Sequence, residues 1–349
     1  MKKLFIAAFM FVSTFTSNVF ADGHAIKMGI ILGFTGPIES LTPAMRDSAK
    51  LAFSEASSSG SLLGGKKITV IEGDSTCVDS AAAQAAAEKL VADGVVAIMG
   101  ADCSGVTGAI ASNVAVPNGV AMISPSATSP GLTDLDDKGF FFRTAPSDAR
   151  GGQILADITK DRKIKSVAIT YTNNDYGKGL ADVYASAVKA HGIKVTTTAA
   201  HEDGKADYTA EVSTLASAGG DALVVIGYLD QGGKGIIQGS LDSGAFDTFI
   251  LSDGMIGDSL TDAFGKNLNK SFGSLPGSTG KGAGVFAKVA KAGGIDSSGP
   301  YTGESYDAAA LLVLAMQAGG SADRASIAKN VMSVANGPGK KIYPGELKK

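Results

Sequence analysis

The sequence predicts an α/β protein made of two doubly wound parallel-sheet lobes. Three observations lead to this prediction. Short apolar runs alternate with helical patterns along nearly the whole chain, which is typical of βαβ units with a parallel sheet. This rhythm stops and starts again near Pro146, so two separate sheets are expected. The chain has 349 residues, of which 44% are hydrophobic, and this length is enough for two cores of ordinary size.

The first residues predict a secretory signal peptide. Two lysines follow the initial methionine, the apolar run Leu4–Val12 comes next, and the small-residue site Val19–Ala21 precedes Asp22. A charged start, a short apolar core and small residues at the cleavage site are the three parts of such a peptide. A buried N-terminal helix is the alternative, but this charge layout gives such a helix no advantage. We therefore expect residues 1–21 to be removed and the mature protein to work in the periplasm.

The first half of the chain is expected to begin with a buried strand, because Ile26–Leu32 is a continuous apolar run. Thr42 and Pro43 then predict the N-cap and the first position of a helix that ends by about Ala56. Asp79 is expected to cap an alanine-rich helix over 80–92. The same rhythm predicts strands over 67–71, 95–99 and 120–124 and a short helix over 106–115.

The second half repeats the pattern after Pro146. Expected helices over 148–160, 175–190, 207–217 and 231–243 alternate with strands over 166–171, 193–198, 222–228 and 248–252. The segment Ser271–Lys281 is rich in Gly and Ser and predicts a linker or crossover. Three further helices, over 283–292, 304–317 and 324–335, have too few strands with them to form a third domain. We expect them to pack onto one of the two lobes.

Cys77 and Cys103 are the two cysteines of the chain. In an exported protein an even pair predicts a disulfide, because the compartment is oxidising. A metal site or a catalytic thiol pair is the alternative, and the lack of histidines near either cysteine disfavours it. We expect no bound metal and no cofactor.

Small polar residues follow two predicted strands of the first half. The strand over 95–99 leads into Gly100–Gly105, which contains Ser104, and the strand over 120–124 leads into Pro125–Thr128. Ligands of open α/β sheets bind beyond the carboxyl ends of the strands. Hydroxyls, backbone N–H groups and the positive end of a helix suit an anion such as a carboxylate. Ordinary turn and cap chemistry is the alternative.

The second half offers aromatic and acidic residues at comparable places. Tyr176 follows one predicted strand, Tyr228 ends another, and Asp253 follows a third. Tyrosines present an amphipathic face to a ligand, and the carboxylate of Asp253 could receive a cation. The alternatives are rim packing for both tyrosines and, for Asp253, a cap of a helix over 258–264.

Six short motifs stand out along the chain: Gly-Phe-Thr-Gly-Pro at 33–37, Gly-Ala-Asp-Cys-Ser-Gly at 100–105, Ile-Ser-Pro-Ser-Ala-Thr at 123–128, Phe-Arg-Thr at 142–144, Asn-Asp-Tyr-Gly-Lys-Gly-Leu at 174–180 and Ser-Gly-Pro-Tyr at 298–301. In their order and spacing, the chain resembles the leucine/isoleucine/valine-binding proteins, the amino-acid receptors of ABC importers. The resemblance spans about Ile26 to Ile342. It implies a type I periplasmic-binding-protein-like fold, whose two lobes are joined by a multi-strand hinge.

The resemblance also implies how the chain is divided. Lobe one would comprise 26–144 plus 278–340, and lobe two would comprise 147–274. Residues 341–349 form a polar C-terminal end. Members of the family continue well past this point, so the C-terminal strand segment is either absent here or truncated. The two cysteines fall where the family has its disulfide.

The resemblance assigns roles at the ends of the strands. The carboxylate of an amino-acid ligand would be held by Ser104, by Ser126 through its backbone, and by Thr128. The amine would be held by the turn that contains Ser126 and Thr128, and by Asp253. Family members usually have Glu at that last place, so Asp implies a slightly shorter reach or a bridging water.

The side-chain pocket departs from the family at two places. Tyr176 and Tyr228 match the tyrosines that close over the ligand. Leu41, however, stands at a position that is often aromatic, and Asp102 stands where the branched-chain receptors have an apolar residue. Asp102 either admits a polar ligand side chain or turns away and contributes only its backbone, so the specificity stays open.

An enzyme is the main alternative class. The sequence contains no Gly-x-Ser-x-Gly, His-Glu-x-x-His or phosphate-binding Gly-x-x-x-x-Gly-Lys-Ser/Thr motif. Ser-x-x-Lys occurs at Ser278–Lys281 and at Ser326–Lys329, but no Lys-Thr-Gly accompanies it. His191 and His201 flank a predicted strand and are interpreted as surface residues. We therefore do not expect an enzyme.

The net charge of −3 comes with no basic block, so the chain offers no footprint for nucleic acid. We expect a monomeric periplasmic solute-binding protein that captures an amino acid, branched-chain or broader, and delivers it to the permease subunits of an ABC importer. One alternative is a ligand without an α-amine, such as urea, an amide or a carboxylic acid. Another is a sensor that passes its signal to a membrane receptor.

Overall fold

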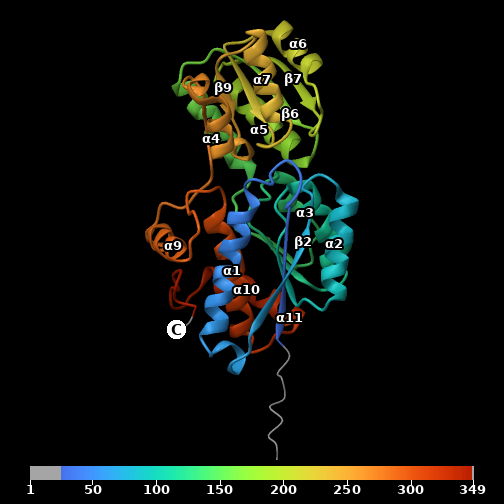
Figure 1. Ribbon diagram of the computed structural model, residues 1–349, viewed down its shortest axis with the longest axis vertical. Coiled ribbons are helices and arrows are strands. Elements are labelled where there is room, and N and C mark those ends of the chain that lie inside the picture. Colours follow the sequence, from blue (N-terminus) through green and yellow to red (C-terminus); the bar gives the residue numbers. More distant parts are fainter. Residues whose placement is uncertain (1–24, 348–349) are drawn as a thin grey trace, which may run out of the picture.

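Two α/β lobes lie one above the other in the computed structural model, which describes residues 25–347 (Figure 1). Each lobe contains one five-stranded parallel sheet, with strand orders β2-β1-β3-β4-β5 and β10-β9-β8-β6-β7. The predicted fold class is therefore confirmed. The predicted signal peptide lies outside the described residues. Within those residues, no helix is long and apolar enough to cross a membrane.

Lobe one is built on the sheet of β1 (Ile26–Leu32), β2 (Ile68–Asp74), β3 (Ala97–Gly100), β4 (Ala121–Ser124) and β5 (Phe141–Arg143). Helices from both ends of the chain lie with this sheet: α1 (Thr42–Ser58), α2 (Ser80–Ala92), α3 (Ser104–Ile110), α9 (Lys281–Ala292), α10 (Thr302–Ala318) and α11 (Arg324–Asn336). Helix α10 packs against both α1 and α11. The late helices therefore pack back onto a lobe, as predicted.

Lobe two is built on the sheet of β6 (Ser166–Thr172), β7 (Lys194–His201), β8 (Ala222–Ile226), β9 (Phe249–Leu251) and β10 (Phe272–Gly273). Its helices are α4 (Asp148–Asp161), α5 (Asp175–Ala190), α6 (Thr209–Ala218), α7 (Gly233–Ser243) and α8 (Asp258–Phe264). The chain passes between the two sheets after β5 and again after β10. The exact lobe boundaries, 26–144 plus 278–340 and 147–274, remain our proposal.

Local features of the first half bear out some predictions and correct others. The Asp79 carboxylate caps α2, since it accepts two backbone N–H groups of the first turn at 2.9 and 3.0 Å. Thr42 is not the N-cap of α1. Leu41 holds that position, and the Thr42 hydroxyl donates to the carbonyl oxygen of Gly33 at 3.2 Å. Strands β5 and β10 escaped prediction, because three and two residues are too few to show a period.

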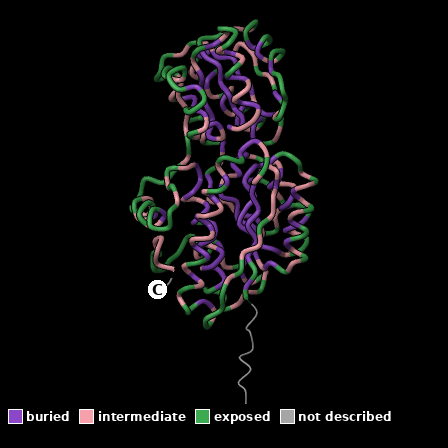
Figure 2. Tube along the Cα trace, viewed as in Figure 1, coloured by how far each residue is buried: buried purple, intermediate pink, exposed green. Residues whose placement is uncertain are grey.

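The cores of the two lobes join at the boundary between them. Figure 2 shows buried residues in the interior of both lobes. The strands β4 and β8 are buried at every residue, as expected for parallel strands covered on both faces. One apolar cluster contains Val106 and Leu132 of lobe one together with Leu180 and Ile226 of lobe two. The two lobes are therefore closed on each other.

Cys77 and Cys103 form the predicted disulfide, which ties the loop after β2 to the N-cap of α3. Replacing both residues, as Cys77→Ala/Cys103→Ala, should lower the free energy of unfolding by about 3 kcal/mol. The reason is that the bond joins positions 26 residues apart and so restricts the unfolded chain. Urea denaturation measures the change, and chemically reduced wild-type protein is the control that should match the variant. An unchanged midpoint would contradict this prediction.

Candidate functional site

A small cavity of about 40 Å³ lies between the lobes, where the carboxyl ends of the two parallel sheets meet. The walls of this cleft include most of the predicted site residues: Leu41, Asp102, Ser104, Ser126, Tyr176, Tyr228 and Asp253. Thr128 is the predicted residue that does not line it. Tyr301 does line it, although no role was predicted for that residue.

The lobe-one wall carries hydroxyl groups on two turns. Ser104 is the first residue of α3, and its Oγ accepts a hydrogen bond from the Ser129 N–H at 3.1 Å. The Ser126 Oγ donates to the carbonyl oxygen of Asp102 at 3.1 Å. Thr128 lies behind this wall, buried, and its Oγ1 has no hydrogen-bond partner among the described residues. The Thr128 hydroxyl lies near the carboxyl of Asp148 and lowers the pKa of that group.

Asp102 turns its side chain into lobe one. Its carboxylate accepts hydrogen bonds from the Gly33 N–H at 2.5 Å, the Cys103 N–H at 2.9 Å and the Ser75 hydroxyl at 3.0 Å. Burial raises the pKa of Asp102, while these three donors lower it. The side chain thus joins the loops that follow β1, β2 and β3, and the three donors already use most of its capacity to accept.

Asp253 is the acid that bridges the lobes. It follows β9, is buried, and begins a 3₁₀ turn over Asp253–Met255. The Tyr176 hydroxyl donates to its Oδ1 at 2.7 Å, and the Tyr301 hydroxyl donates to its Oδ2 at 2.6 Å. Burial raises the pKa of Asp253, while the hydroxyls of Tyr301 and Tyr176 lower it. Asp253 does not cap α8, because Gly257 holds that position.

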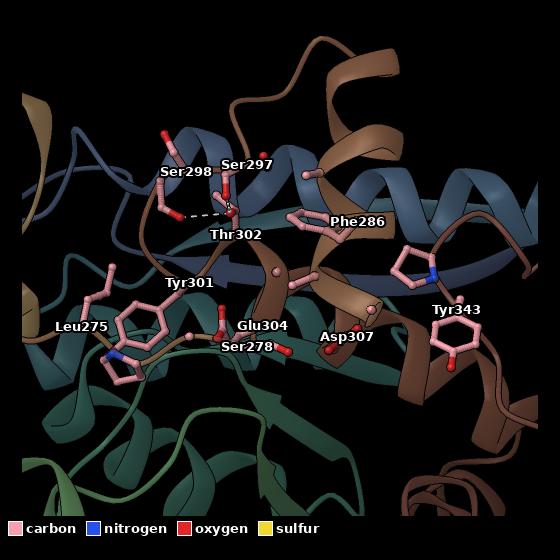
Figure 3. A pocket seen from close by; sticks show the side chains of 18 of the residues that line it. Leu275, Ser278, Phe286, Ser297, Ser298, Tyr301, Thr302, Glu304, Asp307 and Tyr343 are labelled. Carbon is pink, nitrogen blue, oxygen red and sulfur yellow. Dashed lines mark hydrogen bonds between the residues drawn. The ribbon is translucent and has the colours of Figure 1, made fainter. Parts of the chain in front are cut away.

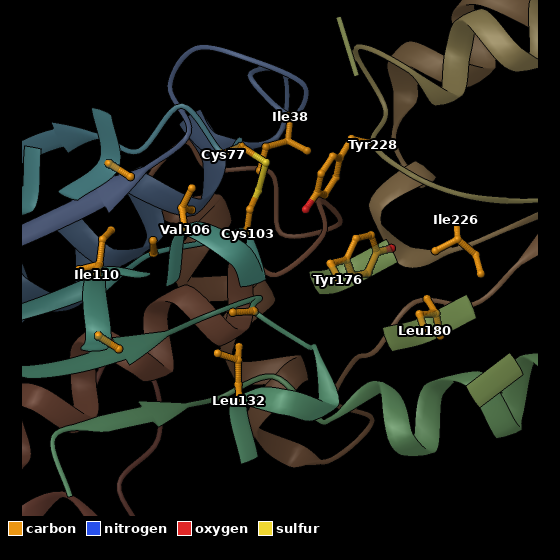
Figure 4. Close-up of a cluster of buried hydrophobic side chains, with 14 of the residues drawn as sticks. Ile38, Cys77, Cys103, Val106, Ile110, Leu132, Tyr176, Leu180, Ile226 and Tyr228 are labelled. Atoms are coloured by element: carbon orange, nitrogen blue, oxygen red, sulfur yellow. A yellow bond between two sulfur atoms is a disulfide. The ribbon is translucent and has the colours of Figure 1, made fainter. Parts of the chain in front are cut away.

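Tyr176 and Tyr228 form the aromatic part of the lobe-two wall. Their rings stack with centroids 5.3 Å apart and an interplanar angle of 20°. Figure 4 shows them between Ile38 and the disulfide on one side and Leu180 on the other. Tyr228 was predicted to end a strand, but β8 ends at Ile226 and Tyr228 lies just beyond it. Tyr228 therefore faces the cleft from beyond the carboxyl end of β8, and Tyr176 faces it from the first turn of α5.

Asp148 is a second buried acid near Asp253. It is the first residue of α4, and its Oδ2 has no hydrogen-bond partner among the described residues. Burial and the charge of Asp253 raise the pKa of Asp148 to about 8, while the nearby Thr128 hydroxyl and the Arg143 guanidinium lower it. The region behind the cleft therefore holds two neighbouring carboxyls that do not both ionise easily.

Sequence reasoning missed Asp148 and Tyr301 for different reasons. An aspartate in the first turn of a helix is ordinary, because the positive helix end favours it, so Asp148 gave no signal of its own. Tyr301 belongs to the Ser-Gly-Pro-Tyr motif at 298–301, and that motif was the signal available. It reaches Asp253 from the start of α10, a contact that only the packing of the lobes creates.

A pair of hydrogen bonds joins the lobes at the rim of the cleft. The Asp230 N–H donates to the carbonyl oxygen of Pro37 at 2.9 Å, and the Ser40 N–H donates to Oδ2 of Asp230 at 2.8 Å. The Asp230 Oδ1 also accepts the hydroxyl of Ser259 at 3.2 Å, which fixes the carboxylate within lobe two. Asp230 therefore holds the loop before α1 without lining the cavity.

The two histidines in the described part of the chain do not line the cleft. His191 lies near the surface, as predicted. Its Nε2 is 2.7 Å from Oδ1 of Asp157. His201 is not a surface residue. It ends β7, is fully buried and lies 2.8 Å from the hydroxyl of Thr170 through Nδ1, because the strand extends further than predicted. Burial lowers the pKa of His201 to about 4. The described residues contain no group of three or more His, Cys, Asp or Glu that could hold a metal.

The raised pKa of Asp148 predicts a pH dependence of stability in ligand-free protein. With a pKa of about 8, the folded protein keeps a proton that the unfolded chain loses near pH 4, so stability should fall as pH rises from about 4 to 8. The slope for one proton is at most roughly 1.4 kcal/mol per pH unit. Asp148→Asn stays neutral, so the free energy of unfolding of this variant should depend less on pH in urea denaturation at pH 5 to 8.

Asp175→Asn, at the exposed start of α5, is the control for the loss of a charge at a helix start. If the wild type and both variants show the same slope of the free energy of unfolding against pH, the assignment to Asp148 is refuted.

Comparison with known proteins agrees with this architecture. A family model described as periplasmic binding protein matches residues 25–338. Leu/Ile/Val-binding protein homolog 1 of Brucella melitensis biotype 1 is 31% identical over 324 residues, which cover 91% of this chain and 84% of that protein. Homolog 3 of the same organism is 31% identical over 234 residues, which cover 67% of this chain and 62% of the relative's own length.

Solved structures are similar along most of the chain. A leucine-binding protein of Thermotoga maritima has a TM-score of 0.77 at 23% identity, covering 88% of this chain and 87% of its own. A branched-chain amino-acid transporter binding protein of Streptococcus pneumoniae, in complex with isoleucine, has a TM-score of 0.75 at 25% identity and the same coverage. A solute-binding protein of R. palustris in complex with 4-hydroxybenzoate has a TM-score of 0.72 at 18% identity, covering 88% and 84%.

These likenesses confirm the resemblance inferred from the six motifs. The family is one of solute-binding receptors of ABC transporters, and a periplasmic location follows from it. With two parallel-sheet lobes, a cleft between them and a family match that covers nearly all of the described residues, the chain belongs to the periplasmic binding proteins, as a type I member of the Leu/Ile/Val-binding kind.

Proposed function

We propose that the protein captures a zwitterionic α-amino acid in the cleft and delivers it to the permease subunits of an ABC importer. The observation that carries this proposal is the charge of the site. Asp253 is buried in the cleft wall, and the described lining residues include no Lys, Arg or His. A buried carboxylate without a cationic partner is costly, so a ligand that brings a cation is favoured over one that does not.

Arg143 does not remove this need. Its guanidinium donates to the carbonyl oxygens of Ala127 and Ser129 at 3.0 and 2.9 Å, and its charge acts on Asp148. Arg143 therefore acts on Asp148 behind the cleft, and no cationic partner is present for Asp253 among the described lining residues. The proposed role of Asp253 is to receive the ligand's α-ammonium group, whose N–H donors match the remaining lone pairs of the carboxylate.

The opposite wall suits the ligand's carboxylate. We assign this end to Ser104, Ser126 and Thr128, as the sequence suggested. The first backbone N–H groups of a helix have no partner within it, and those at the start of α3 lie beside Ser104. An acid on lobe two and hydroxyl and N–H donors on lobe one would orient a zwitterion across the cleft.

Hinge closure would then complete the site. The ligand binds first to lobe one through its carboxylate, and closure brings Asp253, Tyr176 and Tyr228 onto the amine and the side chain. The contacts of Asp230 with Pro37 and Ser40 form at the same time and hold the closed form. A monomer in this closed form is the species proposed to dock on the permease. A sensor that docks on a membrane receptor would use the same motion.

The negative charge of Asp253 also disfavours the ligands that lack an α-amine. The R. palustris relative carries 4-hydroxybenzoate, but an acid without an amine would place a carboxylate near Asp253 with no cation between them, and like charges repel. Urea and neutral amides avoid this repulsion but leave Asp253 unpaired. A branched-chain or broader α-amino acid is therefore the ligand class that we favour.

The test is a thermal-shift and calorimetric panel on ligand-stripped protein. Amino acids should stabilise it, by about 4 kcal/mol at 1,000 times the dissociation constant, whereas the matching 2-oxo acids and 4-hydroxybenzoate should not. Asp253→Asn should weaken amino-acid binding roughly 100-fold or more, because the ammonium loses its buried counter-charge.

Asp258→Asn is the control for the Asp253 variant, since it changes an exposed acid of the same lobe. It should bind the amino acid as the wild type does. Stabilisation by 2-oxo acids, or an Asp253→Asn variant of wild-type affinity, would overturn the amino-acid assignment and leave the family membership intact.

The rim contact gives a second prediction. Asp230→Ala removes the acceptor of the Ser40 N–H at 2.8 Å and should speed ligand dissociation about tenfold, with association little changed. Asp230→Asn keeps an oxygen acceptor and should lie closer to the wild type. Stopped-flow fluorescence measures both rates. An equal slowing of association in both variants would show that Asp230 does not act on the closed form.

A further inference from the structure

Two buried side-chain atoms in lobe two have no hydrogen-bond partner among the described residues: Nε2 of His201, at the end of β7, and Oδ1 of Asp203, just beyond it. A cavity of about 390 Å³ beside α9 and α10 offers no comparable feature. Its described lining includes the carboxyls of Glu304 and Asp307 but none of the buried atoms that lack a partner (Figure 3). Asp203 is therefore an acid outside the cleft with an oxygen that the surrounding side chains leave unsatisfied.

Both atoms face the loop that follows β8. Gly232 ends this loop as the N-cap of α7, and a Cβ added there would overlap Oδ1 of Asp203 and lie 3.3 Å from Nε2 of His201. The same loop carries Tyr228, which lines the cleft, and Asp230, which contacts lobe one. Asp203 therefore packs directly against a segment of the cleft wall, although it does not line the cleft itself.

A chain of hydrogen bonds leads from Asp203 to the cleft across the ends of three neighbouring strands. Asp203 lies just beyond β7, Thr172 ends β6 and Tyr228 lies just beyond β8, and these strands are adjacent in the order β8-β6-β7. The Thr172 hydroxyl donates to Oδ2 of Asp203. Asn174 donates through Nδ2 to the hydroxyl oxygens of Thr172 at 3.2 Å and Tyr228 at 3.5 Å. All four residues belong to lobe two, so the chain does not depend on how far the lobes are closed.

The direction of this chain follows from its donors and acceptors. An ionised carboxylate only accepts, so Thr172 gives its one hydroxyl proton to Asp203. The amide of Asn174, the N-cap of α5, is fixed as well, because its Oδ1 accepts the Gly177 N–H at 3.0 Å. Its Nδ2 is thereby turned toward the two hydroxyls. The Tyr228 oxygen thus accepts from within lobe two, and its own proton is left to be donated on the side of the cleft.

The charge of Asp203 strengthens the chain. Burial raises the pKa of Asp203 to about 6, with a smaller contribution from the charge of Glu202, while the Thr172 hydroxyl lowers it. His201 supplies no cation, since burial lowers its pKa to about 4. The charge of Asp203 also adds to the effect of burial in raising the pKa of Tyr228. Hydrogen bonds to an ionised acceptor are the strong ones, and they polarise the bonds that follow.

Other ionisable groups surround this chain, so its pH dependence has to be read as a difference between two proteins that differ only at position 203. These groups are His201, Glu202, Lys205, Tyr208 and Glu211 on lobe two, Asp230 with Lys234 at the start of α7, and Asp102 and Asp253 on the side of the cleft.

We propose that Asp203 is a positioning residue, which sets Tyr228 as a hydrogen-bond donor to the ligand. The effect passes through Thr172 and Asn174, and Asp203 itself does not touch the ligand. The inference rests on the proposed function, since it assumes that a ligand with an oxygen acceptor, such as an α-carboxylate, lies against Tyr228. Protonation of Asp203 weakens the chain and with it the binding of the ligand.

The first test compares affinities for L-leucine, used as the probe, by calorimetry at pH 5 and pH 7.5, on either side of the pKa of Asp203 of about 6. Asp203→Asn should bind leucine about fivefold more weakly than the wild type at pH 7.5. At pH 5 the two should agree within about twofold, because the wild-type carboxyl is then neutral as well. Glu202→Gln removes the exposed neighbouring charge and should match the wild type at pH 7.5.

Thr172→Val breaks the chain without removing a charge. It should weaken leucine binding at pH 7.5 as much as Asp203→Asn does, and the double variant should be no weaker than either single variant, because all three interrupt the same chain. Thermal unfolding first shows that each variant is folded, and Thr172→Val carries the comparison if Asp203→Asn is not. Wild-type affinity in Asp203→Asn, losses of equal size at both pH values, or additive losses in the double variant overturn the proposal.

A readout without ligand separates this inference from the proposed function. The Cζ carbon of Tyr228 is labelled with carbon-13, and its NMR signal is identified by its loss in Tyr228→Phe. Between pH 5 and 7.5 this signal should shift in the wild type with a midpoint near the pKa of Asp203 of about 6, and shift less in Asp203→Asn. A wild type that shows this shift but binds no leucine counts against the amino-acid assignment and supports the role of Asp203. Equal shifts in both proteins overturn that role, whether or not leucine binds.

Discussion

A carboxylate buried where the lobes meet is the constraint on which the cleft depends. Each oxygen of Asp253 accepts a tyrosine hydroxyl, one from Tyr176 on lobe two and one from Tyr301 beside α10 on lobe one. A buried charge costs several kcal/mol unless it is paired and hydrogen-bonded. Opening the lobes takes away one of the two hydroxyls but returns water to the carboxylate, and a bound cation favours the closed form. In the proposed function, ligand charge and lobe closure would therefore act on the same two oxygen atoms.

Three buried acids near this cleft have different surroundings and so serve different purposes. Asp102 accepts three donors within lobe one and ties its loops together. Asp148 keeps one oxygen without a partner among the described residues and has the charge of Arg143 nearby. Asp253 depends on hydroxyls from both lobes. The number and origin of the donors, more than burial itself, separate a structural acid from one suited to receive a ligand.

The candidate site was predictable in part, because ligands of parallel sheets bind at the carboxyl ends of strands. Local sequence was enough to identify four candidates that follow strands: Ser104, Ser126, Tyr228 and Asp253. The resemblance to the family added Leu41 and Asp102. Tyr301 escaped because it stands at the start of a helix, far along the chain from the residues that it meets. His201 was misplaced on the surface because a longer β7 carries it inside. Helix starts and strand ends depend on neighbours that a sequence pattern does not name.

The sequence by itself determined the α/β class, the two sheets, most helices and the disulfide pair, because each rests on local periodicity, caps and cysteine chemistry. Only the tertiary structure decided which acids remain unsatisfied, which tyrosine walls the cleft and where Asp230 crosses from one lobe to the other. Those facts depend on distances between segments far apart in the chain, such as the 2.6 Å between Tyr301 and Asp253. Periodicity carries no information about such distances, since it reports which face of an element is buried and not what lies against it.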